Sequence, residues 1–102
     1  LRKGLPSDAK NSAGDTTLIS AAALGDEAVV RTLLDGGAEV DAQNAAGNTA
    51  LIVATREGHM EVCRALLSAG ANTGLHNQDG NNAVDTATRR HLTGIVALLE
   101  SR

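Results

Sequence analysis

Apolar residues along the chain gather in short groups that are separated by glycine-rich and polar stretches. Between residues 17 and 35 there are two such groups, one on each side of Gly25. Positions i, i+1, i+4 and i+5 are apolar in the second group, which makes one helical stripe: Val29, Val30, Leu33 and Leu34. The first group is shorter and would turn three residues inward: Leu18, Ala21 and Ala22. The pattern predicts two short helices joined by a tight turn.

The ends of these helices carry their own signals. Thr16 and Thr49 stand just before the first apolar group and can cap a helix, because a threonine hydroxyl accepts hydrogen bonds from free backbone N–H groups. We expect both helices of a pair to end in left-handed turns at glycines: Gly25 and Gly58 after the first helix, Gly37 and Gly70 after the second. The intervening Asp, Asn and Gly residues suit a projecting turn.

The whole pattern returns every 33 residues. Gly14, Gly47 and Gly80 share this spacing, and residues 11–43 and 44–76 are identical at 14 of 33 positions. Self-similarity at such a period is the signature of a solenoid, in which each small unit buries its stripe by stacking on its neighbours. We therefore divide this single domain (1–102) into the end of a preceding repeat (1–10), two full repeats (11–43 and 44–76) and a shortened terminal repeat (77–102).

The repeat resembles the ankyrin repeat. The family pattern T-P-L-H…A-A-x-x-G-H-x-E-V-V-x-L-L-L-x-x-G-A corresponds to TTLISAAALGDEAVVRTLLDGGA in the first unit and to TALIVATREGHMEVCRALLSAGA in the second. The resemblance covers essentially the whole chain. It implies an all-α fold, an ankyrin-repeat solenoid of stacked helix-turn-helix units joined by projecting β-turn loops.

The departures from the family pattern lead to three expectations. Ile19 and Ile52 replace the histidine that ties neighbouring turns together in the family, so the loops should be held less rigidly. In the last unit His91 replaces the inter-helix glycine and Glu100 an inward leucine, as a terminal capping repeat requires. The array is therefore expected to end with this chain, and at least one repeat is expected to precede Leu1.

The resemblance implies a module that binds another protein and does no chemistry. Its contact positions would be the turn tips and the exposed face of the first helices. The tips correspond to Ser12, Ala13, Asp15, Ala45, Ala46, Asn48, Gln78, Asp79 and Asn81. The helix positions correspond to Ala23, Leu24, Arg56, Glu57, Arg89 and Arg90.

The helix positions run from an apolar end to a basic end. Stacked arginines about 10 Å apart repel each other mildly unless an anion lies over them, although Glu57 would neutralise part of this charge. An acidic or C-terminal segment of a partner could therefore lie across the last two repeats. The other interpretation is a solvated charged face, because arginine is a good helix former. An inhibitor that occludes an enzyme's active site, and a structural spacer that binds nothing, are further alternatives.

Composition narrows the possibilities further. The chain is 42% hydrophobic and has no Phe, Trp or Tyr, so its core suits thin, closely spaced layers and it has no aromatic platform for stacking bases. A net charge of −3 argues against nucleic acid as a partner. No apolar run approaches the roughly 18 residues that a membrane helix needs. No targeting segment is present, so the cytoplasm is only a default expectation for a compartment that the sequence leaves unknown.

Candidate chemistry is sparse. His59 and Cys63 lie four apart on a predicted helix, but a structural zinc site needs four ligands, and Cys63 occupies an inward position of the repeat. There is neither a nucleophile elbow nor a phosphate-binding loop. We expect no enzymatic activity, no metal and no cofactor. The chain should be a monomer, with weak end-to-end pairing through Leu1 and Leu5 at high concentration.

Overall fold

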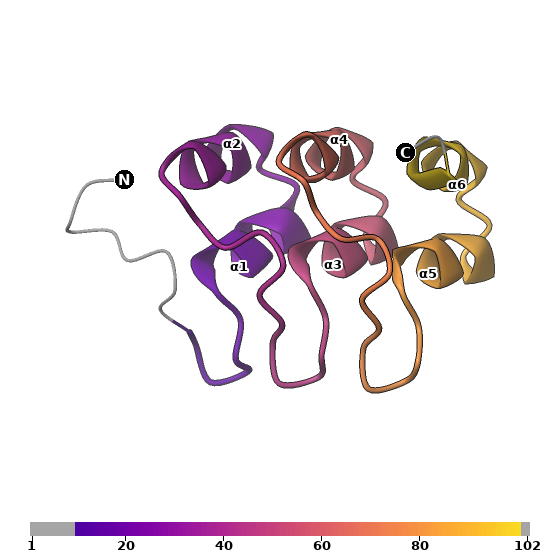
Figure 1. Ribbon diagram of the computed structural model, residues 1–102, viewed down its shortest axis with the longest axis horizontal. Helices are drawn as coiled ribbons and strands as arrows, with labels where there is room; N and C mark the ends of the chain where they lie inside the picture. Colours follow the sequence, from indigo (N-terminus) through magenta and orange to yellow (C-terminus); the bar gives the residue numbers. More distant parts are fainter. Residues whose placement is uncertain (1–9, 101–102) are drawn as a thin grey trace.

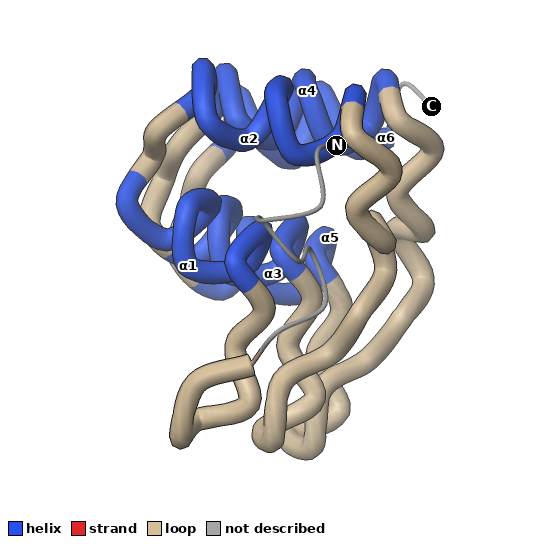
Figure 2. Tube along the Cα trace, turned by 90° about the vertical axis from the view of Figure 1, so that its left-hand side faces the viewer, coloured by secondary structure: helices blue, strands red, loops and turns tan. Residues whose placement is uncertain are grey.

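The computed structural model describes residues 10–100, which form a row of helix pairs with turns projecting from one side (Figures 1 and 2). Leu1 and Leu5, on which the expected end-to-end pairing depends, lie outside this range. The helices are α1 (Thr17–Leu24), α2 (Glu27–Asp35), α3 (Ala50–Arg56), α4 (Met60–Ser68), α5 (Ala83–Arg89) and α6 (Thr93–Glu100). An all-α solenoid of stacked helix pairs is therefore confirmed. Extents of 39 × 24 × 20 Å reflect stacking along one direction.

The first helix of each pair begins at a side-chain cap. The hydroxyls of Thr16 and Thr49 accept from the N–H groups of Ile19 and Ile52, at 3.1 and 3.2 Å. Asn82 takes this place in the last repeat and forms a capping box with Asp85. Because these bonds satisfy N–H groups that the helix leaves free, they define where the helix starts.

The turn between paired helices needs a residue with positive φ. Gly25 supplies it after α1 with φ 74°, and its N–H donates to the carbonyls of Ala21 and Ala22. At the equivalent place after α5, His91 adopts φ 59°. A side chain is strained in this conformation, so the exchange of glycine for histidine keeps the turn at a cost in stability.

The core lies between two helix layers. Helices α1, α3 and α5 form one layer and pack on each other, and each also packs on its partner in the second layer, α2, α4 or α6. Both layers contribute buried aliphatic residues, and Ile19 and Ile52 are 2% exposed, as expected for residues that only pack. Small side chains let the layers approach closely.

One inward position was predicted wrongly. Val29, placed in the buried stripe of α2, is 41% exposed, whereas its equivalent Val62 in α4 is 1% exposed. Helix α4 has α2 on one side and α6 on the other, but α2 packs only on α4 in the second layer of the described residues. A stripe position is therefore buried only where a neighbouring repeat covers it.

Candidate functional site: a polar pocket between the second and third repeats

Each projecting turn is built around one asparagine. The side-chain oxygen of Asn44 accepts from the N–H groups of Ala46 and Asn48, at 3.0 and 2.9 Å. Asn11 and Asn77 make the same pair of bonds in their own turns. Asparagine is suited to this role because its short amide side chain reaches the backbone two and four residues ahead. All three turns therefore have the same shape.

The turns are also bonded to one another. The Asn44 amide donates to the Asp15 carboxylate, and the Asn77 amide donates to the side-chain oxygen of Asn48, both at 2.8 Å. Backbone bonds run in parallel, from Ala45 N to Ala13 O at 3.2 Å and from Gln78 N to Ala46 O at 2.9 Å. We call these inter-turn hydrogen bonds the turn ladder; in each of them the later repeat donates to the earlier one.

The turn ladder bears on two expectations. Where the family has a histidine that ties neighbouring turns, asparagine side chains bridge the turns of this chain. Asn48, predicted as a contact for a partner, is only 7% exposed, and its side-chain oxygen is taken by Asn77. Asp15 is half-buried and likewise bonded to the next turn. These two positions hold the turns together.

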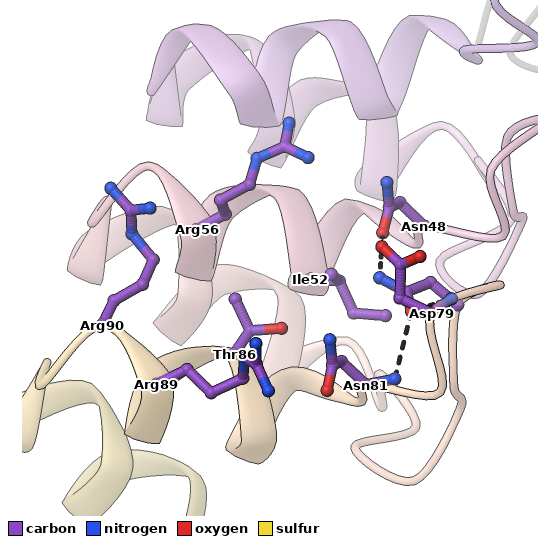
Figure 3. Close-up of a pocket in the computed structure, with 9 residues that line it drawn as sticks. Asn48, Ile52, Arg56, Asp79, Asn81, Thr86, Arg89 and Arg90 are labelled. Carbon is purple, nitrogen blue, oxygen red and sulfur yellow. Dashed lines mark hydrogen bonds between the residues drawn. The ribbon is translucent and has the colours of Figure 1, made fainter.

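Between the repeats of residues 44–76 and 77–102, the second and third repeats, the turns and first helices line an open pocket of about 200 Å³ (Figure 3). Six of the predicted contact positions line it: Asn48, Arg56, Asp79, Asn81, Arg89 and Arg90. Ile52, Asn77 and Thr86 complete the lining. The pocket is therefore polar, with contributions from α3, α5 and the turns that precede them.

The arginines of the pocket have little compensating charge. Arg56 pairs with Glu57 at 3.3 Å, but both side chains are nearly half exposed, so this pair contributes little. Within residues 10–100 no carboxylate pairs with Arg89 or Arg90. Arg56 and Arg89 lie in the last turns of α3 and α5, where the helix dipole favours a cation. The helix dipole thus favours the positive charge of these two arginines, and their guanidinium groups can bind a carboxylate.

The remaining predicted positions lie outside the pocket. Ser12, Ala13, Ala45, Ala46 and Gln78 are exposed at the tips, although the Gln78 amide donates to Ala45 O at 2.8 Å. Leu24 at the end of α1 is 80% exposed, while the neighbouring Ala23 is half-buried with its carbonyl 3.2 Å from the His59 ring. The predicted apolar end of the face is therefore a single exposed leucine.

The described residues offer little for catalysis or metal binding. Cys63 is fully buried; burial raises the pKa of its thiol, and a contact with the Thr55 hydroxyl at 3.5 Å opposes this only in part. A thiol of this kind is a poor nucleophile. Nowhere in residues 10–100 do three or more His, Cys, Asp or Glu side chains gather closely enough for a metal ion. Among the same residues every helix is too short or too polar to span a membrane.

Sequence reasoning missed three residues of the site. Thr86 and Ile52 line the pocket, and Asn77 joins its two turns. Asn77 could have been found, because an asparagine recurs at positions 11, 44 and 77 with the period of the repeat. Thr86 breaks no pattern and lines the pocket only because α3 and α5 lie side by side, which no local signal reveals.

The comparison with known protein families agrees with this architecture. Ankyrin repeats, in three copies, match residues 18–102, and the chain belongs to the ankyrin repeat family. Domains of this family generally mediate protein–protein interactions and are typically non-catalytic. A comparison with individual curated proteins gave no significant match.

Proposed function

We propose that this domain binds a partner protein through the pocket and the adjoining turn tips, with an acidic or C-terminal segment of the partner lying across the second and third repeats. The observation that carries the proposal is the gathering of Arg56, Arg89 and Arg90 around one pocket, the last two without a carboxylate among the described residues. Arginine binds carboxylates through parallel N–H bonds, which gives such a site both affinity and geometric selectivity.

Rigid turns support the same function. A surface that is ordered before binding loses less conformational entropy when it meets its partner. The turn ladder orders the tips on either side of the pocket, so the exposed side chains of Gln78 and Asp79 are presented from a fixed backbone.

The test is affinity capture with two double variants that change the net charge equally. Arg89→Glu/Arg90→Glu reverses the charge of two arginines in the pocket. Arg31→Glu/Arg64→Glu reverses the charge of exposed arginines on the second helices α2 and α4. Circular dichroism checks that both are folded. A partner retained by the unchanged protein and by the control, but lost by the pocket variant, is the expected result. Equal retention by both variants would place the binding surface elsewhere.

A further inference from the structure

The two ends of the pocket differ in charge. Arg56 and Arg89 stand at the C-terminal ends of α3 and α5, with Arg90 directly after α5. Asp79 comes from the turn that precedes α5, and Figure 3 shows it on the opposite side of the view from the arginines, with Ile52 between them. Since α5 has seven residues and an α-helix rises 1.5 Å per residue, α5 is about 10 Å long; with Asp79 in the turn before its first residue, this length sets the scale of the separation between the two ends.

The Asp79 end of the pocket carries a carboxylate that is available to a ligand. The side chain is exposed, and its carboxylate makes no hydrogen bond or ion pair with any residue between 10 and 100; only the backbone N–H is used, in a bond to Asn77. The side chain of Asn81 beside it is likewise unbonded within that range. A second anionic group of a ligand would be repelled at this end, whereas an ammonium or guanidinium group would be attracted.

The size of the pocket favours part of a peptide over a free metabolite. Pockets for small molecules usually measure about 300–1,000 Å³. A pocket of about 200 Å³, open to solvent and running along the helix direction, suits one or two side chains of an extended chain that continues over the turns on either side.

We propose that the pocket selects a dipolar segment, in which a carboxylate lies against the arginines and a lysine or arginine lies against Asp79. This inference rests on the proposed function and specifies its ligand. An extended chain rises about 3.3 Å per residue, so a span of about 10 Å separates the two groups by about three residues. The charge pair also fixes the direction in which the segment lies.

The net charge of the domain supports a dipolar ligand over a strongly acidic one. The chain carries 12 acidic and nine basic residues, so a long acidic run would gain at the arginines and lose against the rest of the surface. The carboxylate can come from an Asp or Glu side chain or from a free C-terminus, since both offer the same two oxygens to a guanidinium group.

Selection from two displayed peptide libraries tests the proposal, one with internal random segments and one with free C-termini. The baits are the unchanged protein, Arg89→Glu/Arg90→Glu, Asp79→Lys and the outer-face control Arg31→Glu/Arg64→Glu. Asp79 is exposed and lacks side-chain partners in the described part, so its replacement should leave the fold intact. The expected motif has an acidic group and a basic residue about three positions apart, and the library in which it appears identifies the source of the carboxylate.

Asp79→Lys gives the decisive comparison. This variant should select peptides with a second acidic residue in place of the basic one. A synthetic dipolar peptide should bind the variant about tenfold more weakly than the unchanged protein, because the attraction between its basic residue and position 79 becomes a repulsion. Peptides that need the arginines but ignore the charge at position 79 would overturn this inference and leave the proposed function standing. Absence of any selected peptide, or equal selection by the Arg89→Glu/Arg90→Glu variant, would overturn both.

Discussion

Single alanine replacements at Gly14, Gly47 and Gly80 separate two reasons for glycine at the turn tips. The three residues have nearly the same φ, at 79°, 83° and 81°, so alanine meets the same left-handed strain at each. Their surroundings differ. A Cβ on Gly14 would lie 2.7 Å from Ala45 N, a Cβ on Gly47 would lie 3.0 Å from Gln78 N, and a Cβ on Gly80 would meet no atom within 4 Å.

The expected losses of stability follow from these contacts. Left-handed alanine costs about 1–2 kcal/mol, and the stiffer unfolded chain returns about 0.4–1 kcal/mol, so Gly80→Ala should lose about 1 kcal/mol. Gly14→Ala and Gly47→Ala add a clash with the backbone of the next turn, and overpacking of this kind costs about 1–3 kcal/mol more. Gly14→Ala should be at least as destabilising as Gly47→Ala, because its contact is shorter.

Urea unfolding followed by circular dichroism at 222 nm measures the three losses. For a slope of about 1–3 kcal/mol per molar urea, an additional loss of 2 kcal/mol moves the midpoint by about 0.7–2 M, which is readily resolved. Gly80→Ala serves as the internal control for backbone strain. Equal midpoints for the three variants would refute the close approach of neighbouring turns, and with it the turn ladder.

Three further predictions concern single side chains. Thr49→Ala should lose about 0.5–2 kcal/mol more unfolding free energy than Thr49→Ser, because both remove the methyl group of a buried side chain but only serine keeps the cap. Equal losses in thermal denaturation would contradict the capping role. His91→Gly should raise the melting temperature, by up to about 4–8 °C for a gain of about 1 kcal/mol, since it relieves the left-handed strain. The thiol of Cys63 should react with a disulfide reagent only slowly in the folded protein and rapidly in urea, and fast reaction without denaturant would show that it is accessible.

Most of the fold could be predicted because its determinants are local and repeated. The hydroxyls of Thr16 and Thr49, Gly25 and the apolar stripes act within one repeat, so a 33-residue comparison exposes them. The exposure of Val29 could not be predicted from a comparison of repeats. It depends on which neighbour covers one side of α2, and the stripe of α2 has the same pattern with or without that neighbour.

The candidate site was predictable as a set of positions but not as a pocket. Arg56, Arg89 and Arg90 were chosen from the register of the repeat, and they do line one cavity. Asn48 comes from the same reasoning and also lines the pocket, but its side-chain oxygen already accepts from an asparagine 29 residues later. The register of the repeat identifies residues at equivalent positions of successive repeats. It does not tell which of their side chains are already bonded to a neighbouring repeat.

Because the pocket is shared by two repeats, it exists only while they remain stacked. Local opening of the third repeat would move Asp79, Arg89 and Arg90 away from Arg56 and Ile52, so this opening equilibrium competes with ligand binding. A ligand at 100 times its dissociation constant would in turn oppose that opening by about 2.7 kcal/mol. Occupancy of the pocket should therefore slow amide hydrogen exchange in α5 and α6 more than in α1 and α2, so that binding stabilises the stacking of the second and third repeats.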